Sequence, residues 1–228
     1  MNQRLQELVR NYQMPAKAID ILMQSKPLLI ASVTGGGKNT IIDELLKTEQ
    51  FHYIISHTTR QPRENHGVLE QNGVNYWFIN EDYLIAELEK QNFIEAKIVH
   101  EQNVYGTSIV EFERAITLGK KPLIEIDVQG VEEMKSHVPD VLAVFLLPPS
   151  FEVWMQRLDR RNNFSEAELQ TRMQTAKQEI TAALDGDFTM VVNDDLKTTV
   201  DYVSQLSRHQ RVDDTLARKL AQELISNL

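Results

Sequence analysis

A short glycine-rich segment carries the clearest chemical signal in this sequence. It begins at Ser32, contains three consecutive glycines before Lys38, and is followed by apolar residues at helical spacing. Glycines let backbone N–H groups converge on a phosphate, a helix N-terminus adds positive potential, and a lysine reaches the outer phosphates of a nucleotide. The segment therefore indicates a phosphate-binding loop between a strand and a helix.

Two positions of this loop depart from the usual pattern G-x-x-x-x-G-K-[ST]. Ser32 replaces the first glycine, and Asn39 replaces the hydroxyl residue that normally faces magnesium, with Thr40 one position later. An Asn carbonyl oxygen is a weaker substitute ligand for that ion. A glycine-rich turn without a ligand is the alternative, and the loop alone does not exclude it.

A second cluster supports the first. The segment Ser56-His57-Thr58-Thr59-Arg60-Gln61-Pro62-Arg63 places two arginines three residues apart beside three hydroxyl side chains, at the end of a predicted strand. Arginine binds phosphate through a planar pair of N–H groups. A basic surface turn is the alternative, but a phosphate loop some twenty residues upstream favours a phosphate site.

Composition excludes several classes of protein. The 228 residues are 42% hydrophobic and 25% charged, which is typical of a globular chain rather than of a disordered or fibrous one. The formal net charge of −9 disfavours nucleic acid and anionic membranes as partners. There is no cysteine, which excludes thiolate chemistry and is consistent with a cytoplasmic location. The six histidines show no metal-binding spacing, and no apolar run approaches the roughly 20 residues of a membrane span.

Short apolar runs alternate with segments of helical period, which predicts an α/β fold with a parallel sheet. Ser165 with Glu168 and Ser108 with Glu111 form capping-box patterns, which predict helices to about Leu184 and Leu118. The candidate strands are Pro27–Ala31, Tyr53–Ser56, Pro122–Ile126, Val141–Leu147 and Met190–Val192.

Two further segments differ from this alternation. Residues 60–106 are rich in loops and contain a predicted strand at Tyr76–Ile79, a helix at Glu81–Lys90 and a strand at Phe93–Val99, which predicts an inserted antiparallel subdomain. Residues 1–25 predict a helical hairpin broken at Pro15. Its apolar stripe must be buried either on the chain's own core or on a second copy, so a homodimer stays open.

In the order and spacing of its motifs, the chain resembles the guanylate kinases over roughly residues 27–208. These P-loop kinases transfer the γ-phosphoryl group of ATP to GMP. The resemblance is carried by Gly35-Gly36-Gly37-Lys38, Ser56 to Arg63, Tyr76 and Phe78, Phe93-Ile94-Glu95, Tyr105-Gly106-Thr107, Ile124 to Gly130, Leu147 to Ser150, Arg157 to Arg161, and Val192 to Asp195.

The resemblance implies two sets of ligand-binding residues. For GMP, Ser56, Arg60, Arg63, Tyr76 and Tyr105 would hold the phosphate, while Glu95, Thr107 and Asp127 would recognise guanine, whose adjacent N–H donors match a carboxylate. For ATP, the implied residues are Thr34, Gly35, Gly36, Gly37, Lys38, Asn39, Thr40 and, beside the adenine, Asn193. Lys38, Arg157, Arg161 and Arg172 would stabilise the transferring group, and Asn39 and Glu125 would hold Mg²⁺, the cofactor that accompanies ATP.

The implied architecture is a three-layer P-loop kinase core with a parallel sheet, formed by residues 26–59, 107–157 and 185–228. A mixed α+β subdomain at 60–106 would bind GMP, a short helical lid would span 158–184, and residues 1–25 would be a helical extension.

The implied activity is guanylate kinase, with ATP and GMP or dGMP as its small-molecule partners. Ser32 and Asn39 motivate one alternative, a guanylate-kinase-like module that binds a nucleotide or a protein with little catalysis. The loop from Glu64 to Asn75, about four residues longer than usual, motivates another, a kinase for a different nucleoside monophosphate.

Overall fold

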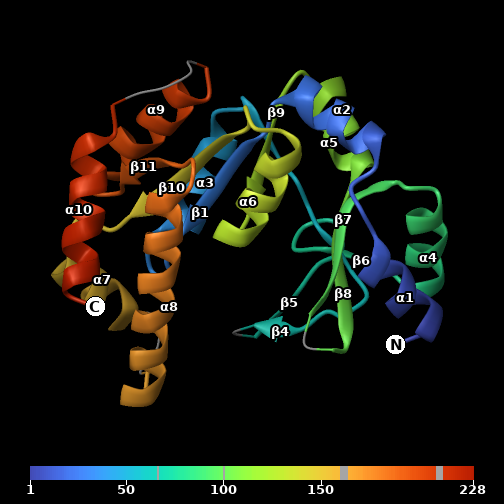
Figure 1. The fold of residues 1–228 in the computed structure, drawn as a ribbon, viewed down its shortest axis with the longest axis horizontal. Helices are drawn as coiled ribbons and strands as arrows, with labels where there is room; N and C mark the ends of the chain where they lie inside the picture. The colour runs from blue at the N-terminus through green and yellow to red at the C-terminus, as the bar shows by residue number, and fades with distance from the viewer. Residues whose placement is uncertain (66, 100, 160–163, 209–212) are drawn as a thin grey trace. The chain divides into compact units, whose positions relative to one another are not determined.

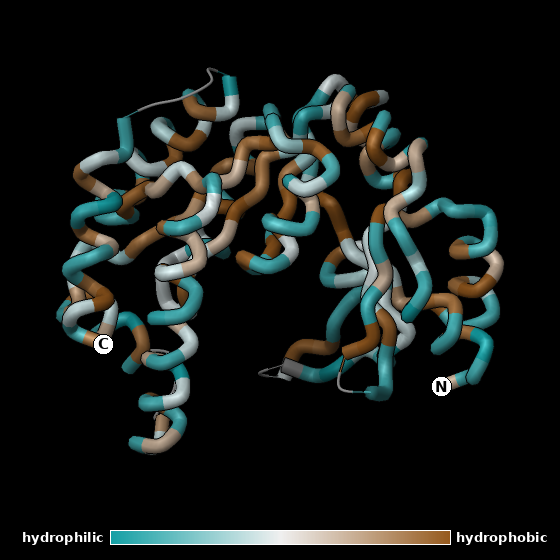
Figure 2. Tube along the Cα trace, viewed as in Figure 1, coloured by the Kyte–Doolittle hydropathy of each residue, from teal (hydrophilic) through white to brown (hydrophobic). Residues whose placement is uncertain are grey.

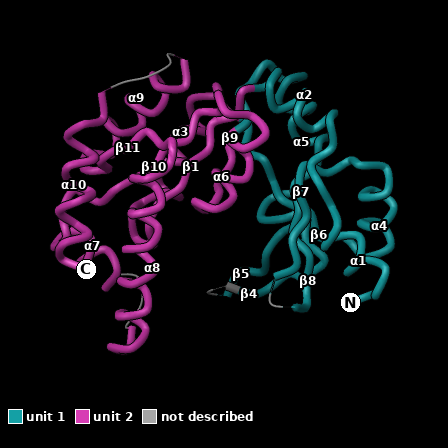
Figure 3. The backbone as a smooth tube through the Cα atoms, viewed as in Figure 1, with its two compact units in different colours: residues 1–25, 52–122 teal, residues 26–51, 123–228 magenta. Residues whose placement is uncertain are grey.

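The computed structural model describes residues 1–65, 67–99, 101–159, 164–208 and 213–228. The chain forms two compact units, and each is described by itself (Figure 3). Unit 1 contains Met1–Ser25 and His52–Pro122, and unit 2 contains Lys26–Phe51 and Leu123–Leu228.

A five-stranded sheet is the centre of unit 2, although residues 52–53 and 121–122, at the ends of two of its strands, are assigned to unit 1. Its strands are β1 (Leu28–Ser32), β2 (Phe51–Tyr53), β9 (Lys121–Glu125), β10 (Leu142–Leu147) and β11 (Thr189–Val192), in the order β11-β10-β1-β9-β2. β10 is parallel to β1 and β11, and β9 is parallel to β1. The prediction of an α/β fold with a parallel sheet is thereby confirmed.

The strands of unit 2 are almost continuously apolar because helices flank the sheet. β1 and β10 are buried along nearly their whole length, and both are coloured hydrophobic in Figure 2. α3 packs on β1 and α9, and α8 packs on α6 and α10 (Figure 1). The helices of this unit are α3 (Lys38–Lys47), α6 (Val128–His137), α7 (Phe151–Asp159), α8 (Glu166–Asp185), α9 (Leu196–Leu206) and α10 (Thr215–Ser226).

Parallel strands bring their carboxyl ends to one edge of the sheet, where ligands of α/β proteins bind. In register, Ile30 of β1 lies beside Val144 of β10 and Glu125 of β9. The phosphate loop after Ser32 and the residues that follow β9 and β11 therefore leave the sheet at the same edge.

Unit 1 is built on a mainly antiparallel sheet. Its strand order is β6-β3-β8-β7, in which β8 pairs antiparallel with β3 and β7 while β6 is parallel to β3. These strands are β3 (His57–Thr58), β6 (Trp77–Phe78), β7 (Phe93–Val99) and β8 (Asn103–Ser108), beside a separate hairpin of β4 (Glu64–Asn65) and β5 (Val68–Leu69). The helices are α1 (Gln3–Asn11), α2 (Ala16–Ser25), α4 (Glu81–Glu89) and α5 (Ile109–Thr117).

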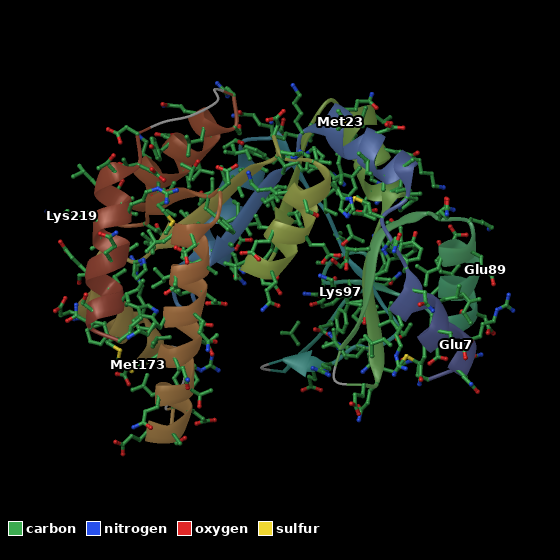
Figure 4. All side chains as sticks on the ribbon, viewed as in Figure 1. Glu7, Met23, Glu89, Lys97, Met173 and Lys219 are labelled. Atoms are coloured by element: carbon green, nitrogen blue, oxygen red, sulfur yellow. The ribbon has the colours of Figure 1, made fainter. Side chains whose placement is uncertain are left out.

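The two N-terminal helices are part of the core of unit 1. α1 packs on α4 and β7, and α2 packs on α5 and β7. Leu5 and Val9 of α1 are buried in one cluster with residues of α4, β7 and β8, whereas Glu7 lies on the exposed face of α1 (Figure 4). The apolar stripe of α1 is thus covered within the chain. It is covered chiefly by α4, β7 and β8 rather than by α2, the second helix of the predicted hairpin.

Tyr12, just beyond α1, ties this segment to the first residue of β7. Its hydroxyl donates to the carbonyl oxygen of Phe93 at 2.9 Å and accepts from the Phe93 N–H at 3.3 Å. Burial raises the pKa of Tyr12 above its ordinary value. Because β7 is an edge strand, this contact satisfies backbone groups that no neighbouring strand could reach.

Two local predictions need correction. The strand predicted at Tyr53–Ser56 lies earlier, at Phe51–Tyr53, because the chain leaves the sheet of unit 2 there and begins β3 at His57. Ser108 is the N-cap of α5 but forms no side-chain capping bond, and Glu111 is buried and pairs with Arg114 at 2.9 Å, so the predicted capping box is not formed. The capping box of Ser165 and Glu168 at the start of α8 is present as predicted.

The substitution Leu5→Ala tests whether α1 stabilises unit 1. Leu5 is fully buried, so we expect a loss of about 2–5 kcal/mol in the free energy of unfolding, measured by urea denaturation. The control is Arg10→Ala on the exposed face of the same helix, with an expected change within about 0.5 kcal/mol. Equal, small effects of both substitutions would show that α1 does not support the unit.

Candidate functional site

The phosphate loop of unit 2 has the backbone that anion binding requires. Gly35 and Gly37 have φ angles of 83° and 93°, which favour glycine over residues with a side chain. α3 begins at Lys38, and Gly37 as its N-cap supplies no side-chain bond to the first N–H groups. Those groups and the positive end of the helix dipole are therefore available to a phosphate.

Ser32 fits this loop because Gly36 has no side chain. A Cβ built at Gly36 would lie 2.0 Å from the Ser32 hydroxyl oxygen, so the hydroxyl occupies the space beneath the loop. The hydroxyl donates to the Val33 carbonyl oxygen at 2.9 Å, and the Gly36 N–H donates to the same carbonyl at 2.9 Å. The first departure from the usual pattern is thus accommodated without opening the turn.

Two side chains of unit 2 hold the loop directly, and a third supports one of them. The indole N–H of Trp154 on α7 donates to the Thr34 carbonyl oxygen at 2.7 Å. The Asn193 amide donates to the Gly36 carbonyl oxygen at 2.9 Å, and its own backbone carbonyl accepts from Arg157 at 3.0 Å. Asn193, predicted beside adenine, therefore uses its side chain to fix the loop.

Lys38 is held by a carboxylate. Its Nζ lies 3.1 Å from Oε1 of Glu125, the residue predicted to orient magnesium, and both side chains remain partly exposed. Asn39 and Thr40 are exposed at the start of α3. The oxygen donors of Asn39 and Glu125 are of the kind that Mg²⁺ binds, and one or two protein ligands suffice because phosphates and waters complete its coordination. The residues present therefore fit the ion.

The predicted catalytic arginines have different surroundings. Nη1 of Arg157 is buried with no hydrogen-bond partner among the described residues, and burial lowers the pKa of this guanidinium. Arg172 stacks on Phe164 at 4.3 Å and lines a cavity of about 440 Å³ together with Thr34 of the loop and Glu179. Burial raises the pKa of Glu179, an effect that nearby Lys38 opposes. Arg161 lies outside the described residues.

In unit 1, the buried Arg60 is the centre of a cluster with two half-buried tyrosines. Its Nε donates to the Tyr105 hydroxyl oxygen at 2.9 Å, and its guanidinium lies 5.3 Å from the centre of the Tyr76 ring. The rings of Tyr76 and Tyr105 are in edge contact at 5.6 Å. Three of the residues predicted to hold the acceptor phosphate are thus brought together.

The longer loop between Arg63 and Tyr76 does not displace Tyr76. Part of the loop folds as the β4–β5 hairpin, and the N–H of Phe78 donates to the Asn72 side chain at 2.8 Å. Arg63 is exposed, and its backbone N–H donates to the Glu70 carboxylate at 2.8 Å. Ser56 is half-buried just before β3.

Two of the residues predicted to recognise guanine lie on the paired strands β7 and β8. Glu95 on β7 faces Thr107 on β8, and the Thr107 hydroxyl donates to Glu95 Oε1 at 2.8 Å. Tyr105 and Thr107 are two residues apart on β8 and therefore share one face of the sheet. Asp127, predicted to join this pair, belongs to unit 2, where one carboxylate oxygen caps α6 by accepting from the Gly130 N–H at 2.7 Å.

The family model described as guanylate kinase matches residues 24–210 of this sequence. The chain belongs to the guanylate kinase family. Among its relatives, the guanylate kinase of Hahella chejuensis is 35% identical over 185 residues, 81% of this chain and 86% of that protein. The guanylate kinase of Pasteurella multocida is 31% identical over 210 residues, 91% of this chain and 99% of that protein.

A solved structure of a guanylate kinase agrees with the fold. The crystal structure of guanylate kinase from Anaplasma phagocytophilum has a TM-score of 0.57 at 25% identity, and the alignment covers 88% of this chain and 93% of that one. Helix α1 lies outside the region that the family model matches. No helix among the described residues has the length and apolar character needed to cross a membrane.

Sequence reasoning missed the residues that hold the binding groups in place. Nothing in the local sequence around Trp154 indicates that its N–H supports the phosphate loop. Glu70 lies inside the lengthened loop, where an acidic residue carries no motif. Both act through contacts with residues distant in sequence, so only the tertiary structure reveals them.

The buried histidine of the second motif predicts a pH dependence of stability. His57 packs between Trp77 and Phe93, and burial lowers its pKa to about 4. The unfolded chain binds this proton near pH 6.5, so the folded state loses stability as the pH falls from about 6.5 to 4.

We expect His57→Gln to remove this part of the loss. As the pH falls through that window, the free energy of unfolding should decrease more for the wild type than for the variant. Urea denaturation at several pH values measures both. Parallel curves for the two proteins would contradict a neutral, buried His57.

Proposed function

We propose that this protein is a guanylate kinase that transfers the γ-phosphoryl group of ATP to GMP or dGMP, giving ADP and GDP or dGDP. The observation that carries the proposal is the arrangement on β8, where Tyr105 and Thr107 share one face. Tyr105 belongs to the arginine–tyrosine cluster, and Thr107 holds the carboxylate of Glu95. The arginine–tyrosine cluster matches a phosphate group, and the Glu95 carboxylate matches a base with adjacent N–H donors.

In this proposal the acceptor nucleotide is recognised by charge at one end and by hydrogen-bond pattern at the other. Arg60, Arg63, Tyr76, Tyr105 and Ser56 bind the phosphate. The Glu95 carboxylate accepts from the adjacent guanine donors N1–H and N2–H₂, a pair that adenine does not offer. Asp127 would add a second carboxylate to the base.

The donor side uses the phosphate loop and its cations. Backbone N–H groups of the loop and the Lys38 ammonium group bind the ATP phosphates. Arg157, whose Nη1 has no partner among the described residues, and Arg172 would stabilise the transferring group. The same role is proposed for Arg161, which lies outside the described residues. Mg²⁺, held through Asn39 and Glu125, would neutralise charge on the β- and γ-phosphates. The Lys38–Glu125 contact keeps both side chains at the loop before the nucleotide arrives.

The reaction itself needs positioning and charge stabilisation rather than covalent catalysis. A new bond forms between an oxygen of the GMP phosphate and the γ-phosphorus, while the bond from that phosphorus to the β–γ bridging oxygen breaks. ADP leaves with that oxygen, and no enzyme-bound intermediate forms. Exclusion of water is essential, because water would otherwise accept the phosphoryl group.

In this proposal the predicted acceptor subdomain at 60–106 and the predicted lid at 158–184 are the mobile segments, and the predicted core is the fixed part. A cytoplasmic location is proposed on the absence of cysteine. The acidic net charge of −9 again disfavours nucleic acid as a partner.

A coupled assay of ADP release with ATP, Mg²⁺ and each nucleoside monophosphate tests the proposal. We expect turnover with GMP and dGMP and little with AMP, CMP or UMP. Saturable GMP binding without turnover would favour the binding module, and turnover with another monophosphate would favour a different acceptor. The fit of Ser32 beneath Gly36 removes one of the two reasons for a binding module.

The substitution Lys38→Ala separates donor chemistry from acceptor binding. Loss of this cation should lower kcat by about 10²–10³-fold or more, because it stabilises developing charge. GMP affinity, measured by calorimetry, should stay within about twofold, since Lys38 is not among the residues proposed to bind GMP. The matched control is Lys47→Ala, an exposed lysine at the end of the same helix, which should leave both quantities unchanged.

A further inference from the structure

The guanidinium of Arg60 is bound by a carboxylate from the lengthened loop. Nη1 donates to Glu70 Oε2 at 2.7 Å and Nη2 donates to Oε1 at 3.0 Å, so the contact is bidentate. The side chains of Arg60 and Glu70 are 7% and 10% exposed. This is a shielded ion pair at the arginine that would meet the acceptor phosphate.

The position of Glu70 is set by the loop that carries it. The backbone N–H of Glu70 donates to the Arg63 carbonyl oxygen at 2.9 Å, and the Arg63 N–H donates to the Glu70 carboxylate at 2.8 Å. These two bonds close the β4–β5 hairpin beside Arg63. One carboxylate therefore links both arginines of the motif, Arg60 through its side chain and Arg63 through its backbone.

Most of the N–H groups of Arg60 are already bonded within the protein. Nε donates to the Tyr105 hydroxyl, and Nη1 also donates to the Gln61 carbonyl oxygen at 2.8 Å. Of its five N–H groups, one on Nη2 has no partner among the described residues. The Tyr105 oxygen accepts from Arg60, and its own O–H has no acceptor among the described residues, so it can donate to an anion.

The ion pair should persist when the phosphate binds. Displacing Glu70 would leave a shielded carboxylate without its partner beside a dianion, which is unfavourable in both desolvation and repulsion. Arg60 also holds the pKa of Glu70 below its ordinary value, so the carboxylate is charged at neutral pH.

We propose that Glu70 is a positioning residue for the acceptor phosphate. It fixes the guanidinium of Arg60 and the backbone of Arg63, so that the remaining N–H of Arg60, the Tyr105 hydroxyl and the Arg63 side chain form one donor set. This inference rests on the proposed function, because it takes the GMP phosphate as the ligand of that set.

Calorimetric titration of the full-length protein with GMP and with guanosine tests this role. Guanosine keeps the base and the sugar but lacks the phosphate, so a positioning role for Glu70 affects only GMP. For Glu70→Gln we expect GMP affinity to fall by about tenfold or more, with guanosine affinity within about twofold of wild type. Glu64→Gln, an exposed carboxylate in the same hairpin, is the matched control and should bind both ligands as wild type does.

Glu70→Asp keeps the charge with a shorter reach and serves if Glu70→Gln does not fold. Its GMP affinity should also fall, by a smaller factor, while guanosine binding is retained. Equal or tighter GMP binding by Glu70→Gln would overturn the proposal, because Glu70 would then compete with the phosphate. Equal losses for GMP and guanosine would also overturn it, because they would show a purely structural role.

The wild-type titration separates this inference from the proposed function. If wild type does not bind GMP, the proposed function fails. If wild type binds GMP and Glu70→Gln binds it equally well, only the role of Glu70 fails.

Discussion

Cations that meet phosphate must be held in place before the ligand arrives, and in this chain carboxylates hold two of them. Glu125 pairs with Lys38 in unit 2, and Glu70 pairs with Arg60 in unit 1. A free lysine or arginine loses side-chain entropy when it binds, whereas a paired one has already lost it. The same pairing explains how a chain of net charge −9 can handle nucleotides, because local geometry rather than net charge governs each site.

The phosphate loop is also held in place before a ligand binds, in its case by neutral hydrogen-bond donors. The carbonyl oxygens of Thr34 and Gly36 are bonded to Trp154 and Asn193, so the loop backbone is fixed from α7 and from the segment after β11. A Cβ at Gly37 would lie 2.2 Å from the Asn193 amide nitrogen, which explains why the loop needs a glycine there as well as a positive φ. Binding groups in both units therefore depend on residues that need not touch a ligand.

The sequence predicts the parts of the structure that depend on local pattern. The apolar runs of β1, β9 and β10 locate the parallel sheet to within one or two residues, because buried parallel strands are continuously hydrophobic. The resemblance to the guanylate kinases, rather than local pattern, implied one site for Arg60, Tyr76 and Tyr105, and these three side chains lie in contact.

Features that depend on tertiary contacts could not be predicted in this way. The partner of Arg60 comes from a loop, and the buried Glu111 pairs with the exposed Arg114 rather than forming a capping box. The covering of Leu5 by α4 and β7 could not be distinguished from burial on a second copy, because an amphipathic pattern does not name its partner.

Hydrogen exchange with mass spectrometry tests most directly the claim that acceptor and donor groups are built separately in the two units. With GMP alone, we expect slower exchange in residues 56–63 and in β8, with little change in the phosphate loop. With a non-hydrolysable ATP analogue and Mg²⁺, residues 33–41 should be protected instead. Protection of the phosphate loop by GMP alone, with residues 56–63 unaffected, would contradict this account.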